Sequence, residues 1–149
     1  MSLELRPLTL DYAQIIHDSV SGNVAEYFYD FKTIEETKEW ITEGVLKHQQ
    51  GSKEEYLILD DQEFIGMISP SFNKPHQAEL GIWIAEKQQG KGYGKQATFK
   101  LIEMLVERGI TEIIYETDHD NQASISLAKS LNFELLKNTD DGITFILRV

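Results

Sequence analysis

The segment Gln88-Gln89-Gly90-Lys91-Gly92-Tyr93-Gly94-Lys95 decides how the rest of this 149-residue chain is interpreted. It follows a stretch with strand-like alternation and runs directly into a stretch with helical periodicity. Its three glycines permit positive φ angles and let the main chain approach a bulky ligand closely. The unpaired amides that begin the following helix attract negative charge, and two lysines add positive charge. The segment therefore predicts a loop that binds a pyrophosphate group.

The stretches around this loop indicate one α/β domain over residues 1–149. Thr33 followed by Glu36 is a capping-box signature, which opens a helix that Gly51 ends. The helix after the loop ends at Gly109. The other expected elements are strands at 3–6, 55–59, 63–68, 77–84, 112–117, 133–136 and 143–149, helices at 11–20 and 121–131, and a loop at 70–75.

Composition excludes several classes of function. The absence of cysteine excludes disulfides, thiolate metal sites and a cysteine acyl-enzyme. The four histidines have no zinc spacing. Asp118-His119-Asp120 faintly resembles a calcium loop, but Ala123 and Lys129 stand where that loop needs Gly and Glu. We therefore expect no metal.

The formal charge of −11 argues against nucleic acid as a partner and favours a cationic one. The sequence shows neither a basic-plus-apolar leader nor an apolar run long enough to span a bilayer. We therefore expect a cytoplasmic protein without a membrane partner, either monomeric or a homodimer.

Two other phosphate-binding loops compete for the same segment. A Walker A loop would need glycine at position 89 and serine or threonine at position 96, and both positions hold glutamine. Residues 92–97 satisfy the dinucleotide pattern G-x-G-x-x-A, with Glu116 or Asp118 about 20 residues further on. However, residues 85–91 separate these glycines from their strand, and little chain remains for further parallel strands. A dinucleotide-binding protein is therefore the weaker alternative.

The loop also resembles the acetyl-CoA signature of the GCN5-related N-acetyltransferase (GNAT) family, through Gln89, Gly92 and Gly94 at the family's spacing. A second motif downstream is similar to another family segment. It consists of Asn121, Ser124, Leu127, Lys129, Leu131 and Phe133. Residues 6–8 and 36–41 resemble the branch that contains the ribosomal-protein N-terminal acetyltransferases. The resemblance spans nearly the whole chain and is most specific over residues 79–133.

This resemblance implies a single-domain fold with a central mixed, largely antiparallel sheet, helices on both faces and an acetyl-CoA cleft where strands 79–84 and 112–117 splay apart. It implies that the protein moves an acetyl group from acetyl-CoA to a primary amine, either a protein N-terminus or a small molecule. With no cysteine for an acyl-enzyme, we expect direct attack in a ternary complex. The expected acetyl-CoA contacts are Ile82, Trp83, Ile84, Gln89, Gly90, Lys91, Gly92, Tyr93, Gly94, Lys95, Asn121, Ser124 and Lys129.

Glu79 is the expected general base, because an ammonium must lose a proton before it attacks. A surface glutamate without a role fits this position equally well, and Glu116, Asp118 and His119 are substitutes. Ser124 matches a family serine that protonates the leaving thiolate, although a capping or cofactor contact alone would also explain it.

Aromatic residues near the first helices are the expected acceptor site, with a core role as the alternative for most: Tyr27, Phe28, Tyr29 and Trp40. Two positions depart from the family pattern. Ala128 replaces the tyrosine that many members use as the acid, which leaves open a catalytically idle acetyl-CoA-binding regulatory protein. Asn132 replaces a glycine, but asparagine also tolerates the left-handed conformation.

Overall fold

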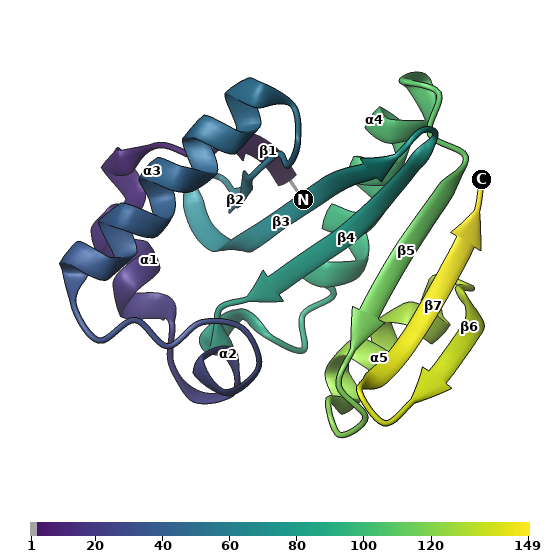
Figure 1. Cartoon of the computed structure of the whole chain (residues 1–149). Coiled ribbons are helices and arrows are strands. Elements are labelled where there is room, and N and C mark those ends of the chain that lie inside the picture. The colour runs from purple at the N-terminus through teal and green to yellow at the C-terminus, as the bar shows by residue number, and fades with distance from the viewer. Residues whose placement is uncertain (1–2) are drawn as a thin grey trace.

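The computed structural model describes residues 3–149 (for residue 23, the backbone only) as one seven-stranded sheet with helices on both faces (Figure 1). The strands are β1 (Leu3–Pro7), β2 (Tyr56–Asp60), β3 (Glu63–Lys74), β4 (Gln77–Ile84), β5 (Glu112–Thr117), β6 (Glu134–Thr139) and β7 (Gly142–Arg148). The helices are α1 (Ala13–Ser19), α2 (Gly22–Tyr27), α3 (Ile34–Gln50), α4 (Tyr93–Glu107) and α5 (Gln122–Ser130), with short 3-10 turns at Leu10–Tyr12 and Glu86–Gln88.

The strand order is β1-β2-β3-β4-β5-β7-β6, and every neighbouring pair is antiparallel except β4 and β5. This arrangement confirms the predicted mixed, largely antiparallel sheet. The first strand lies at one edge of the sheet.

Two apolar cores lie on the two faces of the sheet. On one face, Leu80 and Ile82 of β4 pack in a core with Leu101 of α4 and Ile125 of α5. On the other face, Trp83 packs in a core with residues of α1, α3, β2 and β3. This separation follows from the alternation of side chains along a strand.

Local signals of the sequence place the ends of several helices. Thr33 Oγ1 accepts a hydrogen bond from the Glu36 amide at 3.2 Å, as the capping-box pattern predicts. The Glu36 carboxylate accepts from the backbone amide of Lys32 rather than from that of Thr33. Gly51 ends α3 with a φ of 77°, and Asn132 follows α5 with a φ of 64°. The left-handed turn predicted at Asn132 is confirmed.

The loop predicted at residues 70–75 is wrong, because β3 continues to Lys74 and Pro70 pairs with Leu80 of β4. A proline lacks the amide that a central strand needs. The Pro70 carbonyl accepts a hydrogen bond from the Glu54 amide at 3.0 Å, so the backbone polar groups of Pro70 point toward the β2 side of β3. On that side, the regular ladder between β2 and β3 has already ended at the pair Tyr56–Ile68. The missing donor therefore costs the sheet no regular ladder bond.

Strands β4 and β5 run side by side for only part of their length. Their ladder joins residues 77–80 to residues 112–115 and ends at Leu80–Tyr115. Beyond that pair the two strands separate into a V, with α2 near the open end (Figure 1). The predicted splay between these strands is confirmed.

Candidate active site

Two cavities meet where β4 and β5 separate. The first, which we name the glycine-loop cavity, has a volume of about 380 Å³ and lies between the β4–α4 loop and the start of α5. The second, the acidic cavity, has a volume of about 530 Å³ and lies between the ends of β4, β5 and the β6–β7 hairpin. Six residues line both: Tyr27, Phe28, Ile82, Tyr115, Asn121 and Ser124.

The loop that forms the first cavity has the backbone that its glycines predict. Gly90 and Gly92 have φ angles of 77° and 86°, which side chains other than glycine rarely adopt. No side chain caps the N-terminus of α4, so the first amides of this helix keep their donors for a ligand. A Cβ on Gly94 would stand 3.7 Å from the Leu127 side chain, so the cavity wall is close there.

Side chains on the far side of the loop hold it against the sheet. The buried Gln88 amide donates to Glu63, and Lys91 donates to Gln88 at 3.1 Å. The Tyr93 hydroxyl donates to the Asp60 carboxylate at 2.6 Å. The loop is therefore tied to the β2–β3 turn.

The free edge of β4 supplies main-chain polar groups to the glycine-loop cavity. The Ala85 amide donates to Ile65 of β3 at 2.9 Å, so by alternation the polar groups of Ile82 and Ile84 face the opposite side. That side has lost β5 as a partner beyond Leu80. The Ile84 carbonyl accepts from the Gln89 amide side chain at 2.8 Å. Such an edge can pair with an extended, amide-containing ligand.

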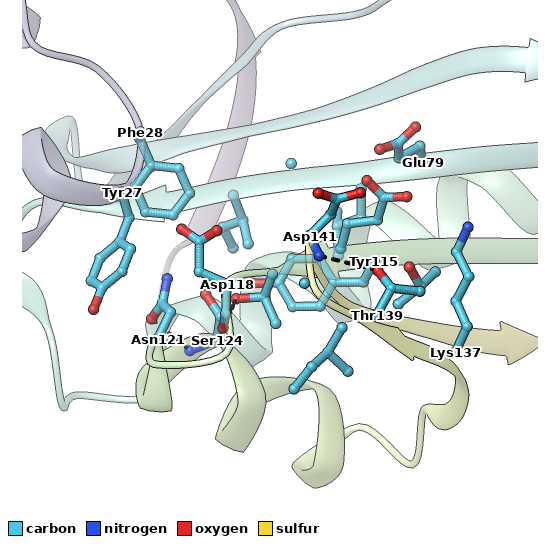
Figure 2. Close-up of a pocket in the computed structure, with 18 residues that line it drawn as sticks. Tyr27, Phe28, Glu79, Tyr115, Asp118, Asn121, Ser124, Lys137, Thr139 and Asp141 are labelled. Atoms are coloured by element: carbon cyan, nitrogen blue, oxygen red, sulfur yellow. Dashed lines mark hydrogen bonds between the residues drawn. The ribbon is translucent and has the colours of Figure 1, made fainter.

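Four carboxylates and one lysine determine the charge of the acidic cavity. They are Glu79, Glu116, Asp118, Asp141 and Lys137. Figure 2 shows Tyr27 and Phe28 on one side of this cavity, Asn121 and Ser124 below, and Thr139 and Asp141 on the β6–β7 side. A cavity with this balance of charge attracts cations.

Glu79 lies on β4, half-buried beside the point where the strands part. Burial raises the pKa of its carboxyl, the nearby charge of Glu116 raises the pKa further, and Lys53 opposes both. A raised pKa brings a carboxylate closer to the range in which it works as a general base.

Ser124 and Asn121 lie where the two cavities join. The Asn121 side chain caps α5 by accepting from the Ser124 amide at 3.2 Å. Tyr115 lines the same two cavities as Ser124 and Asn121. Burial raises the pKa of the Tyr115 phenol, the Ser124 side chain acts in the opposite direction, and the net pKa is raised, so this phenol stays protonated.

Sequence reasoning missed Tyr115, because its strand position identifies it only as a core residue. It also missed Lys137, Thr139 and Asp141, which line the acidic cavity from the β6–β7 hairpin. Nothing local in the hairpin sequence signals that role. The signal available for Tyr115 was its position on the strand expected to splay from β4.

Several expected site residues lie elsewhere. The rings of Tyr29 and Trp40 are tilted against each other with centroids 4.8 Å apart, and both pack against the core beneath α1 and α3, so neither lines the two cavities. The Trp83 side chain is buried in that same core, although the residue borders the glycine-loop cavity. Lys91 and Lys129 line neither cavity. The other expected acetyl-CoA contacts do line the glycine-loop cavity.

A parallel strand pair that splays beside a glycine loop and a free helix N-terminus defines a CoA-dependent acyltransferase. The loop suits a pyrophosphate, and the unpaired β4 edge suits the amides of a pantetheine arm. The family profile described as "Acetyltransferase (GNAT) domain" matches residues 2–134. The chain therefore belongs to the GNAT acetyltransferase family, and it is an N-acetyltransferase whose acetyl donor is acetyl-CoA.

Comparison with known proteins agrees with the ribosomal-protein branch of this family. The chain is 31% identical to the ribosomal-protein-serine acetyltransferase of Escherichia coli strain K12 over 127 residues, which are 77% of this chain and 71% of that protein. A Salmonella typhimurium acetyltransferase that modifies the N-terminal serine of a 50S ribosomal subunit protein superposes with a TM-score of 0.88 at 26% identity, covering 100% of this chain and 96% of that one.

A second solved structure bears on the donor site. It is a ribosomal-protein alpha-N-acetyltransferase in complex with coenzyme A, with a TM-score of 0.89 at 26% identity, and the match covers 100% of this chain and 95% of that one.

Among the described residues, no helix is long and apolar enough to cross a membrane.

Proposed function

We propose that a primary amine binds in the acidic cavity as a cation and attacks the acetyl thioester held in the glycine-loop cavity, with both substrates bound at once. The observation that carries this proposal is the wall of six residues that the two cavities share. A direct transfer needs donor and acceptor sites that open into each other. In the reaction, the amine nitrogen forms a bond with the acetyl carbon, the C–S bond breaks, and the thiolate takes up a proton.

Glu79 removes the proton that makes the bound ammonium nucleophilic. Its raised pKa and its position on the wall of the acidic cavity support this role. The side chains of Glu116 and Asp118 lie in the same cavity and hold the cation near Glu79. A main-chain amide of β4 beyond Leu80 polarises the thioester carbonyl, since that edge has no partner in β5.

Ser124 delivers the proton to the departing thiolate, and Tyr115 supports it. The family tyrosine is replaced by Ala128, which is fully buried in the same core as Tyr115 and offers no donor. Tyr115 reaches the same junction from β5 instead, since it lines both cavities together with Ser124. A phenol that is protonated when the reaction begins can return a proton to Ser124 after the transfer.

We propose that the acceptor is the N-terminus of a protein, because the Salmonella relative modifies the N-terminal serine of a ribosomal protein and the Escherichia coli relative is a ribosomal-protein-serine acetyltransferase. The negative charge of the cavity supports a cationic amine in general. We also propose that the protein works in the cytoplasm, where such an acceptor and acetyl-CoA occur together.

Calorimetric titration with acetyl-CoA, with NADH in parallel, tests the donor site. We expect saturable binding of acetyl-CoA and none of NADH. Release of coenzyme A during incubation with peptides that begin with serine then tests catalysis. Tight acetyl-CoA binding without acetylation of any peptide or amine would instead support an idle regulatory protein.

A further inference from the structure

A third cavity borders the acidic cavity and differs from it in charge. This serine–lysine cavity has a volume of about 360 Å³, and it shares residues 79–81 of β4 with the acidic cavity. Its remaining lining residues are all polar: Lys47, Ser52, Lys53, Ser69, Ser71 and Asn73. The mechanism above uses none of these six side chains.

The strand register places the groups of this cavity in a row beside Glu79. Ser71 of β3 lies directly opposite Glu79, and Lys53 lies opposite Ser71 across an isolated antiparallel bridge. Residues paired in this way project from the same face of a sheet. The row Lys53–Ser71–Glu79 therefore leads from the reacting end of the acidic cavity into the serine–lysine cavity.

Hydrogen-bond donors in this cavity lack partners. Within residues 3–149, no hydrogen bond involves the side chains of Lys47, Ser52, Ser69, Ser71 and Asn73. Ser69 is only 6% exposed as a residue, and it lines this cavity. A Cβ on Gly81 would stand 2.9 Å from Ser69 Oγ, so the glycine leaves this hydroxyl uncovered toward the cavity.

The charges favour an anion once an acceptor is bound. Lys53 is paired with the buried Glu55 carboxylate at 3.2 Å, which leaves the ammonium of Lys47 without an ion pair among the described residues. Glu79 on the rim faces the ammonium of the acceptor under the proposed function. With Glu79 so neutralised, the serine–lysine cavity carries one net positive charge and a set of hydroxyl and amide donors.

We propose that the serine–lysine cavity binds a carboxylate of the acceptor, so that the preferred acceptor is a peptide N-terminus with an acidic side chain at its second or third residue. This inference rests on the proposed function. Lys53 lies two strand spacings from Glu79, roughly 10 Å between backbones. An extended peptide spans roughly 3.4 Å per residue, so its third residue lies roughly 7 Å from its first, and the acidic side chain covers the remaining distance. The carboxylate of a free α-amino acid lies too close to its amine.

Acetylation of three matched peptides tests the proposal. They begin with serine and alanine and differ only at the third residue, which is glutamate, glutamine or lysine. Glycine, as a free amino acid, is the fourth acceptor. We expect the highest kcat/KM for the glutamate peptide, by about fivefold over the glutamine peptide at low salt, and a smaller ratio at high salt. Equal values for the three peptides, or a preference for lysine or for free glycine, would overturn the proposal.

Two lysine substitutions on α3 localise the effect. Lys47→Met removes the unpaired charge of the cavity, whereas Lys38→Met removes an exposed charge of the same helix that lines none of the three cavities. The first is expected to abolish the preference for the glutamate peptide and to leave the glutamine peptide unchanged. The second is expected to change neither value.

An equal loss for both peptides in Lys47→Met would contradict the subsite. Failure of the proposed function has a different signature, since no peptide would then be acetylated by the unmodified protein. Ser71→Ala provides a second variant, because it removes a donor of the cavity without changing its charge. It is expected to lower kcat/KM for the glutamate peptide alone.

Discussion

Leu80 and Tyr115 form the last pair of the parallel ladder between β4 and β5. Leu80 faces the core on the α4 side, and Tyr115 lines the junction of the two cavities together with Ser124. The end of the ladder therefore brings together the unpaired β4 edge, the proposed base and the proposed acid. Each of the following predictions tests one part of this arrangement.

Gly92→Ala is expected to raise the KM for acetyl-CoA several-fold. Its φ of 86° makes a side chain there cost about 1 kcal/mol, which will shift the loop away from the donor. Gly109→Ala is a matched control, since Gly109 has a φ of 88° just beyond the other end of α4 and lines none of the three cavities described above. Both variants are expected to lower Tm by about 2–4 °C, and only Gly92→Ala is expected to change KM. Equal KM values in the two variants would count against the loop as the donor site.

Glu79→Gln is expected to lower kcat by about 10²- to 10⁴-fold, because the amide has no basic oxygen for the proton of the ammonium. Its shape is nearly unchanged, so affinity for acetyl-CoA in calorimetry should be retained. Stopped acetylation with normal binding would support Glu79 as the base. A normal kcat would show that another carboxylate of the acidic cavity is the base.

Glu116→Gln is expected to move the acid limb of the pH–rate profile to lower pH. The negative charge of Glu116 raises the pKa of Glu79, so its removal lowers that pKa, and the base is then deprotonated at lower pH. The measurement is kcat/KM for a peptide acceptor as a function of pH. A shift of the limb to higher pH would contradict the coupling between these two carboxylates.

Ser124→Ala is expected to lower kcat by about 10²-fold, and Tyr115→Phe by a smaller factor, since the phenol acts through Ser124. The Tyr115→Phe variant keeps the ring that packs against Phe133 at 6.2 Å between centroids. In the double variant, the loss should match that of Ser124→Ala alone, because the two groups serve one proton transfer. Additive losses would show that they act independently.

Asn132→Ala is expected to destabilise the fold by about 1 kcal/mol, whereas Asn132→Gly should leave its stability unchanged or slightly higher. The reason is the φ of 64° that follows α5, which glycine adopts freely and alanine does not. Chemical denaturation measures the difference. Equal stability of the two variants would show that the turn relaxes to another conformation.

Local sequence by itself determined the glycine loop, the helix caps and the positions of most strands. Each of these features depends on neighbouring residues: a glycine permits positive φ, and Thr33 reaches an amide three residues away. The family resemblance added the splayed cleft and the acetyl donor, because both follow from motifs that lie close together along the chain.

Tertiary structure alone decided which side chains face the reacting groups. Asp141 comes to the acidic cavity because β6 and β7 pair beside β5, and Ser71 comes beside Glu79 through the register of β3 and β4. The same holds for Pro70, which is tolerated in β3 because its backbone faces a place where β2 has already left the ladder. Aromatic side chains such as Trp40 have the same local pattern whether they line a pocket or a core, and only packing separates the two. A one-residue shift in strand register reverses the face on which a side chain lies, and register is decided by contacts between segments far apart in the chain.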